Sequence, residues 1–175
     1  MRLFVAVPVP AELREKMAAL GNEIRQDGIV PVKPENMHLT LKFLGNTDER
    51  RLAELEQALR GIKFRPFGCA VKGVGVFPDE HYVTVVWAGV ESNGALESLV
   101  KGVQEALPGF GNDERFSAHI TIARVRKKAD LRGFLEKHKG DEFGSFTISS
   151  FELIQSVLGQ GGPKYSTIAE FKAGE

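Results

Sequence analysis

Four segments of the chain repeat apolar residues at the three-and-four spacing of an amphipathic helix. They predict helices at residues 11–26, 49–60, 95–107 and 129–139. Pro10 stands where the first helix begins, a position that suits proline because the first amide hydrogens of a helix lack intrahelical partners. Thr47-Asp48-Glu49 predicts the start of the second helix, and Ser92 or Asn93 is predicted to cap the third.

Other segments are β-rich or alternate apolar and polar residues, which is typical of strands. They predict strands at residues 3–9, 37–44, 67–77, 82–90, 118–125, 143–148, 151–157 and 164–171, with residues 159–162 as a flexible loop. Many neighbouring strands are joined by short turns rather than by helices, which favours an α+β fold with antiparallel sheets. No linker-like shift in composition divides the chain, so residues 1–175 are predicted to form a single two-lobed domain.

The composition narrows the class of protein. Its 42% hydrophobic and 26% charged residues are typical of a globular chain. The 23 basic and 23 acidic residues cancel, so any contact with nucleic acid is expected to be local. The single cysteine, Cys69, excludes an internal disulfide and is expected to be buried. No apolar run is long enough for a membrane span, and we expect a cytoplasmic monomer without a secretory signal.

One short pattern occurs twice, each time in a predicted strand: His38-Leu39-Thr40-Leu41 and His119-Ile120-Thr121-Ile122. Side chains alternate along a strand, so in each copy the histidine and threonine share one face and the aliphatic residues point to the other. A single copy is most often only a histidine on an exposed strand face. With four histidines in the chain, two such pairs arise by chance only about once in a hundred.

Two imidazoles, one neutral and one protonated, can act as general base and general acid on opposite sides of a phosphorus atom. Two threonine hydroxyls can donate hydrogen bonds to the non-bridging oxygens. The pattern therefore predicts phosphodiester cleavage without a nucleophilic side chain. No carboxylate or cysteine is repeated beside the histidines and threonine is a poor zinc ligand, so we expect no metal and no cofactor. His81 and His138 lack the accompanying threonine and are predicted to lie on the surface.

These motifs resemble those of the 2H phosphoesterase superfamily and, within it, the RNA 2′,3′-cyclic phosphodiesterases, also called 2′-5′ RNA ligases. The resemblance extends over nearly the whole chain. Beyond the tetrads it rests on residues 2–7, the run from Asn36 to Gly45, residues 73–78 and 86–89, the run from Phe116 to Val125, and residues 156–158 and 162–165.

The resemblance implies two lobes related by a pseudo-twofold axis, each an antiparallel sheet with helices outside, and one motif per lobe facing a central cleft. It implies that water opens a terminal 2′,3′-cyclic phosphate of RNA, or of a small nucleotide, to a 2′-phosphomonoester without a metal. In that scheme His119 is the base, His38 is the acid, and Thr40 and Thr121 hold the phosphate. Ligation is the same chemistry in reverse.

Further residues could contribute to such a cleft. An arginine at the place of Arg124 is usual in the family, yet strand alternation puts it on the side away from His119 unless the strand bulges. The same alternation puts Lys42 on the face of His38, where we expect a solvated lysine. Tyr165 could bind substrate by stacking on a base or fill the core, and Phe116 is expected in the core.

Other functions remain open on the sequence alone. The substrate could be another cyclic phosphate, such as that of ADP-ribose, or a phosphate at an oligonucleotide end. The two motifs could also hold an RNA end without turnover. In a third alternative, the repeated tetrad is a coincidence in a structural protein.

Overall fold

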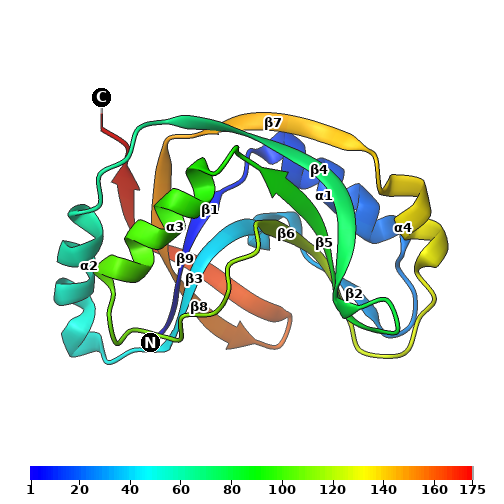
Figure 1. Cartoon of the computed structure of the whole chain (residues 1–175). Helices are drawn as coiled ribbons and strands as arrows, with labels where there is room; N and C mark the ends of the chain where they lie inside the picture. The colour runs from blue at the N-terminus through cyan, green and yellow to red at the C-terminus, as the bar shows by residue number, and fades with distance from the viewer. Residues whose placement is uncertain (175) are drawn as a thin grey trace.

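Two antiparallel sheets and four α-helices make up residues 1–174, the part of the chain that the computed structural model describes (Figure 1). This confirms the α+β class. The strands are β1 (Arg2–Pro8), β2 (Ile29–Pro31), β3 (His38–Asn46), β4 (Phe67–Asp79), β5 (Tyr82–Glu91), β6 (His119–Val125), β7 (Glu142–Ile148), β8 (Ser150–Gly159) and β9 (Gly162–Lys172). The helices are α1 (Ala11–Glu23), α2 (Leu52–Arg60), α3 (Ala95–Ala106) and α4 (Arg132–His138).

The two sheets repeat one arrangement. The first has the order β3-β1-β8-β9 and the second β2-β6-β5-β4-β7. Apart from β2, each strand of one sheet has a counterpart in the other, and both motif strands, β3 and β6, take equivalent places. β3 and β6 contact each other, so the two tetrads meet where the sheets meet.

The helices cross between the two halves. Helix α1 follows β1 of the first sheet but packs against β2, β6 and β7 of the second, whereas α3 follows β5 of the second sheet and packs against β3 of the first. In Figure 1, α2 and α3 lie in the left half of the view and α1 and α4 in the right half. The single two-lobed domain stays a prediction, which this interlocking supports.

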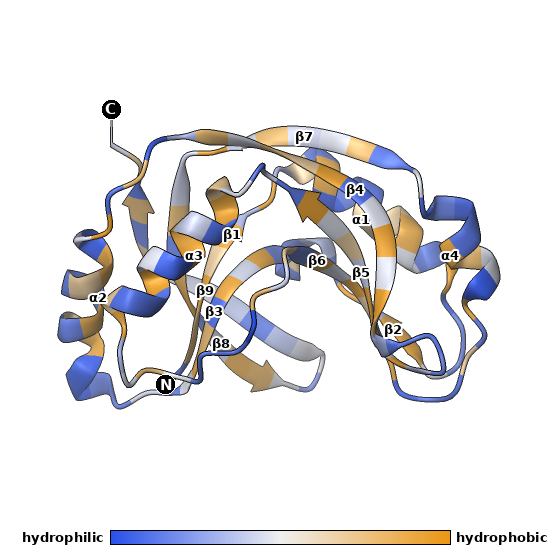
Figure 2. Cartoon of the chain, viewed as in Figure 1, coloured by the Kyte–Doolittle hydropathy of each residue, from blue (hydrophilic) through white to orange (hydrophobic). Residues whose placement is uncertain are grey.

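A single hydrophobic cluster contains buried residues from both sheets and all four helices. Met17, Leu55 and Leu96 put the apolar faces of α1, α2 and α3 into it, and each is fully buried. Hydrophilic residues lie on the outer sides of α2 and α4 (Figure 2). Burial of such faces is the dominant stabilising contribution to a fold of this kind. Cys69 is buried in the same cluster, as expected.

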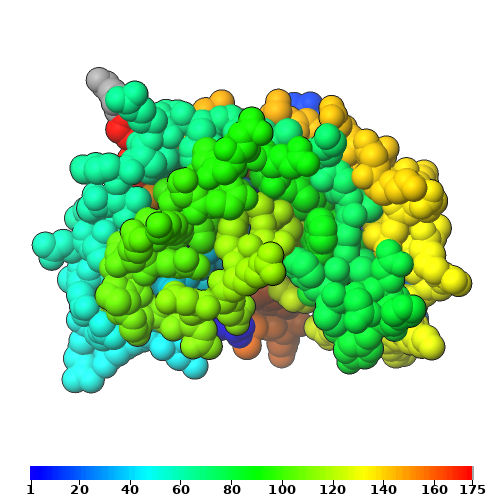
Figure 3. All heavy atoms as spheres, viewed as in Figure 1, coloured from blue at the N-terminus to red at the C-terminus, as the bar shows by residue number. Residues whose placement is uncertain are grey.

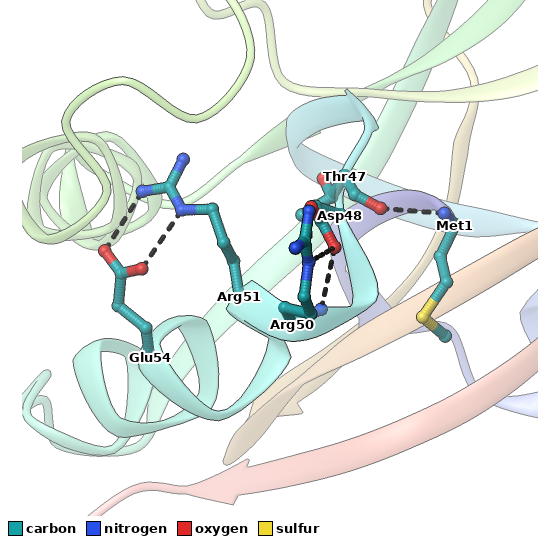
Figure 4. A network of polar contacts seen from close by, with 6 residues as sticks. All are labelled: Met1, Thr47, Asp48, Arg50, Arg51 and Glu54. Carbon is teal, nitrogen blue, oxygen red and sulfur yellow. Dashed lines mark hydrogen bonds and ion pairs between the residues drawn. The ribbon is translucent and has the colours of Figure 1, made fainter.

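The start of the second helix matches the sequence signal in outline. Residues Glu49–Arg51 form a 3₁₀ turn that continues into α2. The carboxylate of Asp48 accepts a hydrogen bond from the backbone N–H of Arg50 at 2.9 Å. Figure 4 shows this cap together with the ion pair of Arg51 and Glu54 and the Met1 amino group, which donates to the Thr47 carbonyl at 2.7 Å. These contacts fix the corner between β3 and α2.

Two expectations are corrected, and one strand was missed. Residues 159–162 are no flexible loop, because β8 and β9 pair as far as Gly159 and Gly162, which leaves a two-residue hairpin turn. The fourth helix spans only Arg132–His138, and the three-residue strand β2 was too short to be recognised. No helix of residues 1–174 is long and apolar enough to cross a membrane.

Candidate active site

Strands β3 and β6 bring both tetrads to one cleft. His38, Thr40, His119 and Thr121 are half-buried and line a cavity of about 370 Å³. The aliphatic residues between them, Leu39, Leu41, Ile120 and Ile122, are buried on the opposite side. The predicted alternation is therefore confirmed through the length of each tetrad.

Both strands carry a β-bulge directly after the threonine. In the β1–β3 ladder Thr40 faces Ala6 and Lys42 faces Val5, so Leu41 has no opposite residue. In the β5–β6 ladder Ile122 is left over in the same way, between Thr121 and Ala123. A bulge puts two consecutive side chains on one face, so the alternation is reversed beyond it.

The bulges correct the placement of two residues. Arg124 is exposed on the cleft side with His119 and Thr121, although alternation alone puts it on the other side. Lys42 was expected to be a solvated lysine on the face of His38, and this is wrong. Its side chain is 3% exposed and forms an ion pair with Asp113. Phe43, which alternation assigns to the core face, is 61% exposed and lines the cleft.

The loop that precedes β6 is attached to the bulge of β3. Besides the pair of Lys42 and Asp113, Gly111 lies directly against the backbone of Phe43, where its positive φ and the absence of a side chain are both required. This loop, residues 107–118, crosses the near face between the two halves (Figures 1 and 3). It walls a second, wider part of the cleft, of about 790 Å³, which shares His119, Thr40 and Thr121 with the first.

The loop also orients His119. Its Nδ1 lies 2.7 Å from the Ser117 carbonyl oxygen, which can only accept, so Nδ1 carries the hydrogen and a neutral ring has its lone pair on Nε2. The ring packs edge-on against Phe77, with centroids 5.0 Å apart. Burial lowers the pKa of His119 from its ordinary value, the Ser117 carbonyl opposes that shift, and the charge of Arg124 adds to it.

His38 has a different environment. Its ring packs edge-on against Phe4 and Tyr165, at centroid distances of 6.1 and 5.7 Å, and its Nδ1 has no hydrogen-bond partner among the described residues. Burial lowers the pKa of His38. The backbone of Asn36, although it falls short of regular hydrogen-bond geometry, and the charge of Glu152 oppose this lowering, and the charge of Arg14 adds to it.

Two aromatic residues singled out from the sequence, Tyr165 and Phe116, also line the cleft. Tyr165 lines the cleft from β9 and packs on Phe4, with ring centroids 5.0 Å apart. Phe116 packs against the core as expected, but it is only half-buried and also lines the wider part of the cleft. All six residues singled out from the sequence, His38, Thr40, His119, Thr121, Arg124 and Tyr165, line the one cavity.

His81 is exposed, as predicted, whereas His138 is not a surface residue. It is 7% exposed, with Nδ1 2.7 Å from the Asp141 carboxylate and Nε2 2.9 Å from that of Glu23. The last turn of α4 reaches the end of α1, so the middle residue of the charged run Lys137-His138-Lys139 turns inward. No group of three or more histidine, cysteine, aspartate or glutamate side chains in residues 1–174 is placed to hold a metal ion.

Sequence reasoning missed several residues of the cleft: Arg2, Lys33, Phe43, Phe77 and Arg126. One signal was available. Phe43 and Arg124 follow their histidines at the same spacing, so a bulge that brings one of them into the cleft predicts the same for the other. Arg2, Lys33 and Arg126 had no such signal, since they belong to segments far apart in the chain.

An α+β protein with two such sheets and paired histidines and threonines in a shared cleft has the architecture of a two-histidine phosphoesterase. Comparison with known proteins agrees. A family model described as LigT-like phosphoesterase matches residues 7–87. The RNA 2′,3′-cyclic phosphodiesterase of Archaeoglobus fulgidus is 40% identical, over 98% of this chain and 100% of that protein, and that of Methanocaldococcus jannaschii is 34% identical over the same shares.

Two solved structures match over nearly their whole length. TT0787 of Thermus thermophilus is 31% identical with a TM-score of 0.82, over 98% of this chain and 97% of that one. E. coli LigT complexed with 3′-AMP is 23% identical with a TM-score of 0.83, over 99% and 98%, and supports the fold alone. The chain belongs to the LigT-like phosphoesterase family, the 2H phosphoesterases.

Proposed function

We propose that this protein opens the 2′,3′-cyclic phosphate ends of RNA to 2′-phosphomonoesters by general acid–base catalysis with two histidines. The observation that carries the proposal is the meeting of two intact His-x-Thr units in one cleft. It is supported by relatives named RNA 2′,3′-cyclic phosphodiesterase at 34–40% identity over 98% of the chain. A site with two proton-transferring groups and two hydroxyl donors suits displacement at phosphorus.

In the proposed reaction Nε2 of His119 takes a proton from water, and the water oxygen forms a bond to phosphorus. The bond from phosphorus to the 3′ oxygen breaks, and His38 donates a proton to that oxygen, which leaves the phosphate on the 2′ oxygen. The hydroxyls of Thr40 and Thr121 donate to the non-bridging oxygens, and the Arg124 guanidinium stabilises the charge on them. Two histidines perform both proton transfers, so the scheme needs no metal or cofactor.

Local contacts support this division of roles. The Ser117 carbonyl holds Nδ1–H of His119 and leaves the Nε2 lone pair as the acceptor. Burial lowers the pKa of both rings. The charge of Arg124 lowers that of His119 further, whereas at His38 the charge of Glu152 opposes the lowering and the smaller effect of Arg14 adds to it. Tyr165 would fix the His38 ring by their edge contact and close that side of the substrate site. Ligation would use the same groups in reverse, and water would normally outcompete it.

The test uses the whole protein, treated with EDTA, and a short RNA that ends in a 2′,3′-cyclic phosphate. The product is identified by its mass and by the position of the phosphate. We expect the 2′-phosphate without added metal. A 3′-phosphate would reverse the roles of His38 and His119, and a requirement for metal would contradict the mechanism.

An unchanged substrate would refute the proposed activity. Tight binding without turnover would then indicate a module that holds RNA ends. Turnover of the cyclic phosphate of ADP-ribose alone would instead assign the site to that substrate.

A further inference from the structure

Positive charge is concentrated in the narrower part of the cleft, where no other part of residues 1–174 neutralises it. The narrower part of the cleft is lined by Arg2, Lys33, Arg124 and Arg126, and by no aspartate or glutamate among the described residues. The chain as a whole carries no net charge, so this concentration is local. A concave site of one sign attracts an anion of the opposite sign more strongly than a flat surface does.

All four cations are exposed, and none forms an ion pair within residues 1–174. Some other exposed cations do form ion pairs: Arg50 pairs with Asp48 at 2.7 Å, and Arg132 with Asp130 at 2.8 Å. In the wider part of the cleft Lys42 is likewise paired, with Asp113. Lys63 and Arg115 are likewise exposed without an ion pair among the described residues, so what sets the four cations apart is that they line one cavity together, without a carboxylate among its described lining residues.

The backbone holds these cations in place from three segments. Arg2 begins β1, where it lies between Asn46 of β3 and Ser156 of β8. Lys33 follows β2, and its Nζ donates to the carbonyl of Gly161 in the β8–β9 turn at 3.1 Å, which leaves two N–H groups free. Arg126 follows β6, and its backbone N–H donates to the Gly28 carbonyl at 2.7 Å.

Arg124 and Arg126 are two positions apart, which on an extended backbone separates them by about 7 Å. Beyond the bulge, Arg124 is the cation nearer Thr121 along β6, and Arg126 is the next one outward. From Arg124 to Arg126 the positive charge thus extends away from Thr121.

The number of cations exceeds what the reacting phosphate needs. A 2′,3′-cyclic phosphate carries one negative charge, which the threonine hydroxyls, the histidines and Arg124 accommodate in the proposed function. Arg2, Lys33 and Arg126 are then left without an anion. In an RNA chain that ends in a cyclic phosphate, the next anion is the phosphodiester on the 5′ side of the terminal nucleoside.

We propose that Arg2, Lys33 and Arg126 form a binding subsite for this neighbouring phosphodiester, so that the protein prefers an oligonucleotide end to a nucleoside 2′,3′-cyclic monophosphate. This inference rests on the proposed function, because it takes the paired tetrads as the place of the reacting phosphate. Contacts from cations to phosphate oxygens are charge-assisted and salt-sensitive.

Three substrates test the inference: a nucleoside 2′,3′-cyclic monophosphate, a dinucleotide with the same cyclic end, and that dinucleotide with its internal linkage replaced by an uncharged methylphosphonate. We expect kcat/KM to be about tenfold to a hundredfold higher for the charged dinucleotide than for the other two, mainly through KM. The advantage should fall as the salt concentration rises. Equal kcat/KM for all three would overturn the inference.

Variants assign the effect to the three cations. Arg2→Gln, Lys33→Gln and Arg126→Gln combined should lower the ratio of kcat/KM between dinucleotide and mononucleotide toward one. Lys63→Gln is the matched control, since Lys63 is exposed, lies outside the cleft and forms no ion pair in residues 1–174, and it should keep the wild-type ratio. A ratio unchanged in the triple variant would contradict the assignment.

The two proposals fail differently. Turnover of every substrate without preference leaves the proposed function standing and removes the subsite. No turnover of any of them refutes the proposed function itself, and with it the subsite. A higher kcat/KM for the cyclic phosphate of ADP-ribose than for the dinucleotide would assign the cations to a nucleotide diphosphate and overturn the RNA subsite.

Discussion

Strands β3 and β6, which carry the repeated tetrad, are alike up to the bulge and differ directly after it. Both place a histidine and a threonine in the cleft, and both then bulge at Leu41 or Ile122. The next cleft-facing residue is Phe43 in one strand and Arg124 in the other. The histidine and threonine shared by the two strands form two equivalent sets of groups that suit a phosphate. The residue that differs, Phe43 or Arg124, puts a permanent charge only on the strand that carries His119.

The surroundings of the two histidine rings also differ. His119 has its Nδ1 held by Ser117, whereas Nδ1 of His38 has no partner among the described residues. A symmetric pair of imidazoles cannot divide the roles of acid and base by itself. The surroundings of the two rings, rather than the motifs, provide the asymmetry that the proposed mechanism needs.

The largest expected effect is the loss of either imidazole. His38→Ala and His119→Ala should each lower kcat by about 10²- to 10⁴-fold, the usual contribution of general acid–base catalysis. Both rings are half-buried at a cleft, so thermal unfolding should change little. His81→Ala is the control, because His81 is exposed at a turn and should keep wild-type turnover. Near-normal turnover in His119→Ala would contradict the mechanism.

The residues after the two bulges should respond very differently. Arg124→Gln should lower kcat by roughly 10²-fold, because it removes a charged donor beside the charge that develops in the transition state. Phe43→Leu, at the equivalent place on β3, should change kcat by less than about threefold. Steady-state kinetics on the cyclic dinucleotide measures both. Equal effects would mean that the difference between the strands has no part in the chemistry.

The loop of residues 107–118, which precedes β6 and packs on the bulge of β3, allows a comparison of stability. Asp113→Ala leaves the buried ammonium of Lys42 without a partner and should lower the free energy of unfolding by about 1–3 kcal/mol. Lys42→Met should cost less than about 1 kcal/mol, because methionine fits a buried site and Asp113 is 70% exposed. Urea unfolding measures both.

Asp27→Ala is the control for that experiment. It breaks the exposed pair of Asp27 and Lys127, where less than about 0.5 kcal/mol is expected. The role of the Lys42–Asp113 pair would be refuted if Asp113→Ala were as mild as this control.

The smallest effects concern pH. Catalysis needs neutral His119, which is present above its pKa, and protonated His38, which is present below its pKa. Burial lowers both from the ordinary value of 6.5, so the bell-shaped profile of kcat/KM should have its maximum below pH 6.5. A maximum above pH 7 would contradict the lowered pKa of the two rings.

Removal of a single charge beside each histidine should shift the two limbs of the pH profile of kcat/KM in opposite directions. Arg124→Gln removes a charge that lowers the pKa of His119, so the limb that reports His119 should move to higher pH. Glu152→Gln removes a charge that raises the pKa of His38, so the limb that reports His38 should move to lower pH. Movement of both limbs in the same direction would indicate a general electrostatic effect rather than two separate environments.

Much of the site could be predicted from the sequence because it depends on local periodicity. Side-chain alternation in a strand is a backbone property, and it placed His38 with Thr40 and His119 with Thr121 correctly. Helix periodicity and capping residues such as Asp48 located the helices within a few residues. That any positive field is a local one stays a prediction from the net charge.

The errors share one cause. A bulge is defined by the pairing of a strand with its neighbour, so the exposed Arg124 and the buried Lys42 depend on β5 and β1, which the motif itself does not contain. His138 was misplaced because its burial depends on Glu23 at the end of α1. For Arg124, Lys42 and His138 alike, the local sequence does not decide the direction of the side chain. The neighbouring strand or helix decides it.

The sequence by itself thus determined the α+β class, the two His-x-Thr strands and the kind of chemistry they support, because each follows from the spacing of neighbouring residues. The tertiary structure alone decided that both strands face one cleft, that their bulges turn Phe43 and Arg124 into it, and that Arg2, Lys33 and Arg126 line the same cavity. The physical reason is that side chains from distant segments become neighbours only when the sheets pair and pack.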